Sequence, residues 1–279
     1  MQKNGFRDGA YFLCHVKNYL DIKRGQSGVY PITVSSNISL IYGNTNISFL
    51  SLVSSLFFQT FFLHRYASHN MFKMSPFWEK TFFFLTFIFQ GSSFLHPAAY
   101  SVMHKRHHSH ADTPKDPHSP VHLKNIISFN LATVVKYRKL VNEFMKGERT
   151  ITDAPRWHRL ESIAESLWTR VAFIFLYFLF YVFFATSTWQ YLLFPLHITM
   201  GSMHGFIVNW FGHKTGYRNY DSMPDNSKNT LPVDFLMMGE LYQNNHHRKP
   251  KELNFAVRWF ELDFGYLATS VLKRLKKIY

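Results

Sequence analysis

The chain has 279 residues, of which 47% are hydrophobic and 18% aromatic, and it carries 31 Lys and Arg against 17 Asp and Glu. This length suits one large domain or two small ones, and the apolar content excludes a disordered or fibrous chain. The single cysteine, Cys14, excludes an intrachain disulfide scaffold and a paired-cysteine zinc or redox site.

Charged residues are absent from three stretches of the chain, which are residues 25–64, 81–104 and 171–213. In the first stretch, residues 47–63 are strongly apolar and predict one membrane span, while the polar residues 30–46 leave a second crossing open. The middle stretch is interrupted at Gly91 and Pro97, which favours a re-entrant or interfacial segment over residues 81–103. The third predicts a transmembrane hairpin over residues 171–208, with its polar turn at residues 186–188.

The distribution of basic residues predicts the orientation of these spans. Of the 31 Lys and Arg, 26 lie in residues 64–80, 104–170 and 214–279, which the positive-inside rule places in the cytoplasm. The other five precede the first span and fit this rule only if residues 30–46 complete a second crossing. The N-terminus does not resemble a cleaved signal peptide. Residues 209–279 are expected to form a cytoplasmic cap, and the final LATSVLKRLKKIY is either a basic helix on an anionic leaflet or a solvated tail.

Seven of the 16 histidines form three short groups at the edges of the apolar segments. The groups are HRYASH (His64, His69), HKRHH (His104, His107, His108) and QNNHH (His246, His247). Imidazole is the commonest side-chain ligand for iron, zinc and copper, so the groups predict a metal site, and their number suggests two metals. The three histidines of HKRHH share one helical face, whereas His64 and His69 are about 140° apart on a straight helix. The latter pair therefore reaches one centre only near a helix end, or else two nearby centres.

The three groups resemble, in order, the histidine boxes of the membrane fatty acid desaturases, specifically the acyl-CoA Δ9 group and its bacterial relatives. The quoted segments are HRYASH, HKRHH followed by ADTPKDPHSP, and GELYQNNHH. The resemblance runs from about residue 47 to about residue 250, with a hydrophobic hairpin between the second and third boxes. It implies a single membrane desaturase domain over residues 1–279 and an all-α integral membrane fold. That fold has three or four transmembrane helices, a re-entrant or interfacial helix, and a cytoplasmic helical cap that holds a di-metal site.

The resemblance also implies a ligand set for two iron ions, Fe2+ or Fe3+. The direct ligands would be His64, His69, His104, His107, His108, His213, His246 and His247, with Asn209 holding a water on one iron. Gln243 stands where the Δ9 acyl-CoA enzymes usually carry histidine, and glutamine is a weaker ligand. Asp112, Asp116 and Glu240 flank the boxes and either orient imidazole N–H groups or are surface carboxylates. His110 and His118 do not match ligand positions, and His96, His158, His197 and His204 are interpreted as packing or hydrogen-bonding residues.

The implied reaction is the O2-dependent introduction of a cis double bond into a long-chain acyl group, most simply an acyl-CoA. No catalytic residue is expected beyond the metal ligands, because side-chain acids and bases cannot attack an unactivated C–H bond. The chain lacks a haem HPGG motif, a CxxC site and a GxGxxG fingerprint, so we expect a separate ferredoxin- or cytochrome b5-like electron donor with its reductase. The lipid bilayer is the other expected partner, and no nucleic acid is expected.

Two other functions remain open from the sequence. A fatty acyl or hydrocarbon hydroxylase or related oxygenase would use the same type of di-iron site, and its product would carry oxygen. A non-redox metal transporter or sensor would place polar ligands inside the spans near the bilayer midplane, whereas these motifs lie at span ends. The expected location is the bacterial inner membrane, with the active site facing the cytoplasm.

Overall fold

The computed structural model describes residues 47–123 and 125–279, and within these residues the regular elements are helices with a few isolated β-bridges. Three described helices are long and apolar enough to cross a membrane, namely Ile47–Ser68, Leu167–Phe184 and Thr188–Phe211. The all-α membrane fold is thereby confirmed. Residues 30–46 and the five N-terminal basic residues lie outside the described part of the chain.

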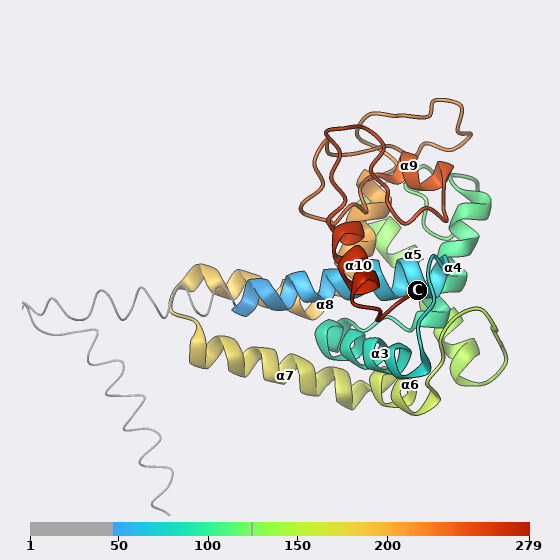
Figure 1. Cartoon of the computed structure of the whole chain (residues 1–279). Helices are drawn as coiled ribbons and strands as arrows, with labels where there is room; N and C mark the ends of the chain where they lie inside the picture. The colour runs from blue at the N-terminus through green and yellow to red at the C-terminus, as the bar shows by residue number, and fades with distance from the viewer. Residues whose placement is uncertain (1–46, 124) are drawn as a thin grey trace, which may run out of the picture. The chain divides into compact units, whose positions relative to one another are not determined.

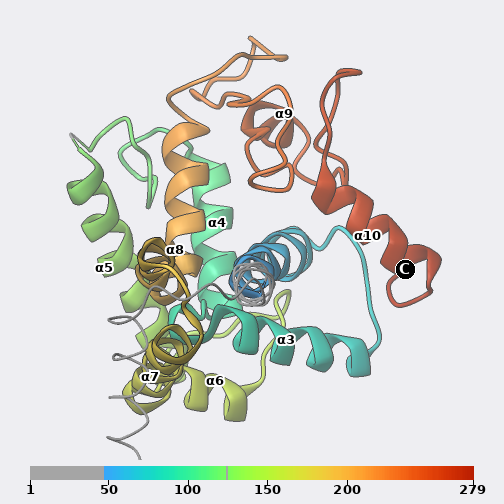
Figure 2. The same cartoon turned by 90° about the vertical axis from the view of Figure 1, so that its left-hand side faces the viewer.

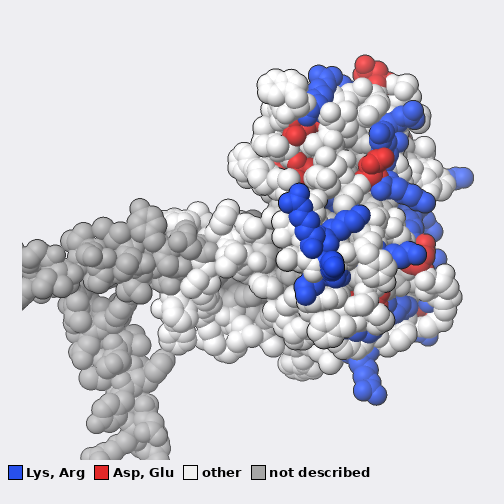
Figure 3. Space-filling model, in the orientation of Figure 1, with Lys and Arg blue, Asp and Glu red and all other residues white. Residues whose placement is uncertain are grey.

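The three spans extend in the same direction from one end of the described protein (Figure 1). Helix α7 (Leu167–Phe184) turns through η3 (Thr188–Leu192) into α8 (Leu193–Phe211), as a transmembrane hairpin requires. Only 6% of the most apolar window of α7 is buried inside the described protein, as expected for a helix that faces lipid. The described parts of the spans show an uncharged surface, and Lys and Arg gather at the opposite end (Figure 3).

The segment between the first span and the second histidine box contains two helices. Helix α3 (Pro76–Gln90) lies across the direction of the spans (Figure 2). Ser75 caps its N-terminus, because the Ser75 Oγ accepts a hydrogen bond from Trp78 N. The chain then reverses through η2 (Gly91–Ser93) into α4 (Pro97–His110). Gly91 has φ +50°, and a Cβ there would lie 1.8 Å from the Tyr177 hydroxyl, so this reversal requires glycine. The interfacial position of residues 81–103 remains a prediction.

The remaining helices pack around α4 and the end of the first span. Helix α5 (Ile126–Met145) packs against α4, and α6 (His158–Glu165) leads into α7. Helices α9 (Gln243–Arg248) and α10 (Phe264–Arg274) belong to the C-terminal part of the cap (Figure 2). Tyr279 and Lys73 exchange two backbone hydrogen bonds of 2.7 and 2.9 Å, so the C-terminal segment is docked on the protein and is not a solvated tail.

The main core is rich in phenylalanine side chains, many of them from the first span and α3. Phe61 and Phe82 meet edge to face at 4.8 Å between ring centroids, and Phe62 and Phe83 do so at 5.6 Å. All four rings are buried. Because Phe61 and Phe62 immediately precede the first histidine box, this packing fixes the position of the box at the end of its span.

Candidate metal centre

The first span ends as a π-helix, η1 (Gln59–Ser68). In a π-helix each backbone N–H bonds to the carbonyl five residues earlier, and His69 N donates to His64 O at 3.2 Å in this way. The two rings are 5.0 Å apart between centroids. The two histidines therefore face one centre, which the geometry of a straight α-helix allows only near a helix end.

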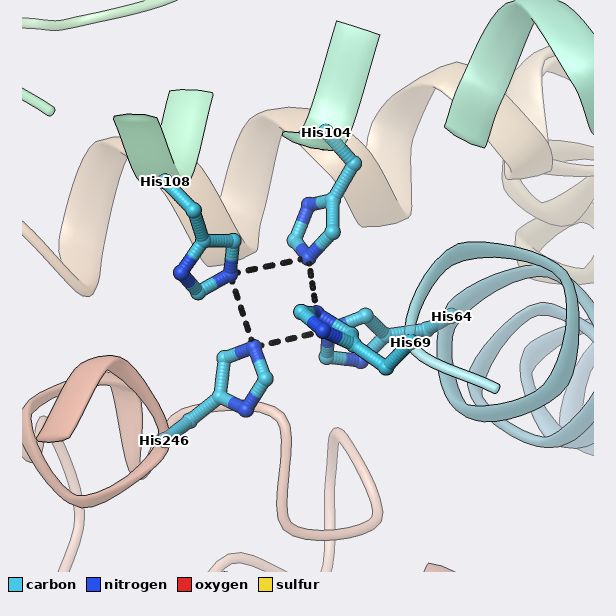
Figure 4. A group of neighbouring side chains, drawn as sticks. All are labelled: His64, His69, His104, His108 and His246. Carbon is cyan, nitrogen blue, oxygen red and sulfur yellow. Dashed lines mark hydrogen bonds between the residues drawn. The ribbon is translucent and has the colours of Figure 1, made fainter. Parts of the chain in front are cut away.

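A five-histidine cluster forms where η1, α4 and α9 meet (Figure 4). Its members are His64, His69, His104, His108 and His246, and one ring nitrogen of each lies within 4.8 Å of all the others. The Nε2 atoms of His69 and His104 are 2.7 Å apart, and those of His64 and His246 are 3.0 Å apart. The Nε2 atom of His108 lies 3.1 Å from that of His104 and 2.9 Å from that of His246. Five ring nitrogens thus converge on one point.

A second group, the three-histidine cluster, lies beside the first and consists of His107, His213 and His247. Each member donates its Nδ1–H to a buried or half-buried carboxylate, at 2.8 Å to Asp116, 2.9 Å to Asp112 and 2.7 Å to Asp225 respectively. The Nε2 atoms of all three are buried and have no hydrogen-bond partner among the described residues. The second histidine box is therefore shared, with His104 and His108 in one cluster and His107 in the other.

Burial favours the neutral form of four histidines of the five-histidine cluster, whereas hydrogen bonds from histidines keep Asp112, Asp116 and Asp225 ionised. Burial, followed by repulsion from His64, lowers the pKa of His69 to about 2, and burial holds the pKa values of His104, His108 and His246 well below 6.5. Burial alone would raise the pKa of Asp116, but the hydrogen bond from His107 lowers it to about 2. The neutral imidazole is the form that binds a metal.

The donor set fits two cations. A neutral imidazole has one ring nitrogen without a hydrogen, and the lone pair of that nitrogen can bind a metal ion. In the three-histidine cluster the carboxylates fix the proton on Nδ1 and leave Nε2 as a free acceptor, which is the usual arrangement around a metal-binding histidine. The eight histidines are therefore suited to hold one metal ion in each cluster.

A buried ionic network supports the first cluster. Glu240 Oε2 lies 2.5 Å from His64 Nδ1, and the other carboxylate oxygen accepts a 2.9 Å hydrogen bond from Arg65. Arg65 is fully buried, forms two further hydrogen bonds of 2.8 and 3.0 Å with Asp263, and lies over the ring of Phe255. Because Asp263 also caps α10, the network connects the C-terminal helix to His64.

Asn209 and Gln243 belong to neither histidine cluster. Each lies four residues before a histidine of the three-histidine cluster, Asn209 before His213 and Gln243 before His247, and both line a small cavity beside the five-histidine cluster. The amide of Asn209 donates to Gly205 O at 2.7 Å, and that of Gln243 donates to Glu240 O at 2.6 Å. Both side chains are therefore held close to the two histidine clusters.

Sequence spacing missed two residues of this region. Asp225 accepts a hydrogen bond from His247, but it lies 22 residues earlier in the chain, in a turn-rich loop outside the three histidine boxes. His118 does not match a box position, yet its ring lies 4.6 Å from that of His107 and its buried Nε2 has no partner among the described residues. In contrast, His197 bonds to Tyr181 at 2.6 Å, and Nδ1 of His96 accepts a hydrogen bond from Ala99 N at 3.3 Å, as expected for hydrogen-bonding residues.

An apolar pocket leads to the histidines between α4, α5 and α8. Its walls include Met103, Phe129, Val134 and Phe206, and it reaches His104, His118 and Asn209. The pocket also shares Tyr100 and Gly205 with the small cavity beside the five-histidine cluster. Its lining suits an unbranched hydrocarbon more than a polar ligand.

The fold and the two histidine clusters define a membrane protein with a metal site at the end of its spans. The model of the fatty acid desaturase family matches residues 45–269, and the chain belongs to this family. It is 26% identical to the sn-1 stearoyl-lipid 9-desaturase of Anabaena variabilis over 214 residues. These aligned residues cover 76% of this chain and 74% of that protein. The hex-5-enoyl-[acyl-carrier protein] acetylenase of Moorena producens is 26% identical over 260 residues. The aligned residues cover 88% of this chain and 76% of that protein. Membership implies a fatty acyl substrate, O2 and a membrane environment.

Proposed function

We propose that this protein is an O2-dependent fatty acyl desaturase that introduces a cis double bond with the help of two iron ions. The observation that carries the proposal is the convergence of eight buried or half-buried histidines in two adjacent clusters at the inner end of an apolar pocket. The balanced reaction converts –CH2–CH2–, O2, two electrons and two protons into –CH=CH– and two water molecules. When bound, the irons supply the activation of dioxygen that abstraction from an unactivated C–H bond requires.

The role of the chain's own residues is to bind, orient and exclude water. The eight histidines are proposed as the ligands, and Asp112, Asp116 and Asp225 hold three of them in the required orientation. The apolar pocket positions the acyl chain so that a chosen pair of methylene groups lies at the histidines. Asn209 is proposed to hold a water, and Gln243 is a candidate ligand from the same cavity.

The proposal also specifies which carrier molecule holds the acyl chain. The histidine boxes resemble those of acyl-CoA Δ9 desaturases, and we propose acyl-CoA and a Δ9-like position on that basis. A lipid-linked acyl chain is the second candidate, because the relative from Anabaena variabilis is named for a stearoyl lipid. Helix α5, which lines the pocket, also exposes Ile127, Leu131 and Val135 along one side, where a bilayer could contact it.

The electron donor and the orientation complete the proposal. The cap carries the exposed Lys and Arg side chains (Figure 3), which suit an acidic ferredoxin- or cytochrome b5-like donor. The same charge distribution supports an inner-membrane protein whose cap faces the cytoplasm.

The test is a reconstitution of the iron-loaded protein in lipid nanodiscs with a reduced donor and its reductase. One arm receives stearoyl-CoA and the other contains a stearoyl glycerolipid, and mass spectrometry of the products follows. An acyl product lighter by two hydrogens supports the proposal, and the arm in which it forms identifies the carrier. A hydroxylated product would establish the oxygenase instead, and iron-loaded protein that converts neither substrate would contradict the proposal.

A further inference from the structure

Helix α10 exposes an apolar stripe along its length. The stripe consists of Phe264, Leu267, Val271 and Leu275. These residues follow one another at spacings of three and four, so they share one face of the helix, and each is between 39 and 59% exposed. Gly265 and Thr269, on the other side of the helix, are buried. Single exposed apolar side chains need no explanation, whereas a continuous stripe indicates a surface that another molecule covers.

The interior of the protein holds this helix in place. Asp263 caps α10 by accepting a 2.8 Å hydrogen bond from Tyr266 N, and it also accepts a 2.8 Å hydrogen bond from the buried Arg65. A Cβ at Gly265 would lie 2.8 Å from Nη1 of Arg65, so the backbone of α10 lies directly against the buried ionic network. The helix therefore presents its apolar stripe in a fixed direction.

The end of the stripe is strongly basic. Residues 264–279 contain four Lys and Arg and no Asp or Glu, and three of the basic side chains, Lys273, Arg274 and Lys276, are exposed. Lys and Arg gather at the border of the uncharged surface of the spans (Figure 3), at the place that α10 occupies in the same view in Figure 1. Exposed apolar side chains beside basic ones are complementary to a bilayer surface that contains anionic lipid.

The position of α10 relative to the spans also fits a bilayer surface. The helix packs against η1, at the end of the first span. In Figure 2 the first span is seen end-on and α10 lengthwise, so α10 lies parallel to the plane of a bilayer that the spans cross.

The start of α3 extends the same surface with aromatic side chains. Lys277 lies 4.7 Å from the ring of Trp78, and Ile278 pairs with Met74 in an isolated β-bridge. Phe77, in the first turn of α3, is 69% exposed. Tryptophan is enriched where membrane proteins meet the headgroups of the bilayer. The two helix ends therefore form one surface with the composition of a membrane interface.

We propose that α10 and the start of α3 lie in the headgroup region of the membrane and that α10 binds anionic phospholipids there. The apolar stripe enters the boundary of the acyl chains, and Lys273, Arg274 and Lys276 contact the lipid phosphates. A lipid surface suits this face better than a protein partner does, because the bilayer crossed by the spans already adjoins it. The inference does not depend on the proposed reaction, since it rests on the spans and on α10 alone.

The experiment measures the depth of the stripe with a fluorescent label at Val271→Cys, in a full-length chain whose single native cysteine is replaced by Cys14→Ala. The protein is reconstituted in nanodiscs of phosphatidylcholine with increasing amounts of phosphatidylglycerol, and a lipid with a nitroxide near its headgroup serves as the quencher. We expect quenching at residue 271 to increase with phosphatidylglycerol. The same label at Glu148→Cys, in the exposed loop between α5 and α6, should be quenched little in every bilayer.

A second comparison tests the basic side chains. Lys273→Gln with Arg274→Gln should weaken the apparent affinity for phosphatidylglycerol, measured by the label at residue 271, about fivefold for each basic residue removed. The matched control is Lys139→Gln with Lys146→Gln, an equal change of charge on α5, which lies on the other side of the protein in Figure 2. This control should behave as the parent chain does, and only variants that keep the parent Tm are compared.

Three results would overturn the inference. A label at residue 271 that is quenched in neither type of bilayer would place α10 in water and leave its stripe to a protein partner. Equal quenching with and without phosphatidylglycerol would show that α10 does not select anionic lipid. An equal loss of affinity in both double variants would attribute the effect to the net charge of the protein and not to α10.

Discussion

The replacement Asp225→Asn tests the assignment of a separate metal position to the three-histidine cluster. Asp225 Oδ2 accepts the Nδ1–H of His247 at 2.7 Å, and its other oxygen is held by Ser227 N at 3.0 Å. Burial alone would raise the pKa of this carboxyl group, but the hydrogen bond from His247 keeps it below its usual range. The group is therefore an ionised carboxylate that fixes the proton of His247 on Nδ1.

The size of the effect follows from this contact. An asparagine amide replaces a charge-assisted hydrogen bond with a neutral one, and its NH2 group can turn toward His247 and oppose the required tautomer. Loss of such a contact costs about 1.5–3 kcal/mol. This corresponds to about a ten- to hundredfold loss of metal affinity at the three-histidine cluster, in agreement with the usual effect of removing the partner of a ligating histidine.

The assay is a chelator titration of the iron-loaded protein, with iron counted per chain. Asp225→Asn should release one iron at a lower chelator concentration and retain the other as the wild type does. The matched control is Asp153→Asn, which changes an exposed aspartate that pairs with Lys105 at 2.8 Å, and it should behave as the wild type. Equal weakening of both irons, or of neither, would refute the assignment of two separate positions.

Three further predictions concern stability and packing. Replacing Arg65 with methionine leaves two buried carboxylates without their cation and should destabilise the fold by about 3–5 kcal/mol. Arg138 is half exposed, and its partner Glu165 also pairs with Arg170, so Arg138→Met should cost less than about 1 kcal/mol in the same thermal unfolding experiment. The Tm of the metal-free protein should fall as the pH decreases from about 6.5 toward 4, because burial lowers the pKa of His247 to about 4 and the unfolded chain therefore takes up protons first. A Tm that is constant or rises over this range would contradict the neutral state of the histidines. Gly212→Ala places a Cβ 2.4 Å from a side-chain atom of the third box and should lower the iron content, while Gly205→Ala, whose added Cβ meets no atom within 4 Å, should retain both irons.

The sequence was sufficient to predict the spans and to find the histidines, because charge-free stretches and closely spaced imidazoles are local patterns. It was insufficient to predict how the histidines divide between two centres. On an ideal helix His104, His107 and His108 share a face, but the surrounding elements direct His107 toward different partners. The convergence of His64 and His69 depends on a π-helix, which residue spacing alone did not indicate.

The supporting residues show the same limit. Asp112 and Asp116 could be identified because they follow the second box directly, and φ +60° at Asp112 is a conformation that aspartate tolerates better than most residues. Asp225 is remote from the boxes in sequence and reaches His247 only through the fold of the cap.

Whether these residues desaturate an acyl chain can be determined from the total fatty acids of an expressing cell. An iron-replete bacterial host would express the wild-type chain or, at equal level, His107→Ala, which removes one member of the three-histidine cluster. Mass spectrometry should find a new cis double bond only with the wild-type chain, at one position in the acyl group. A new hydroxyl or keto group in place of the double bond, or the same double bond in cells that express His107→Ala, would contradict the account.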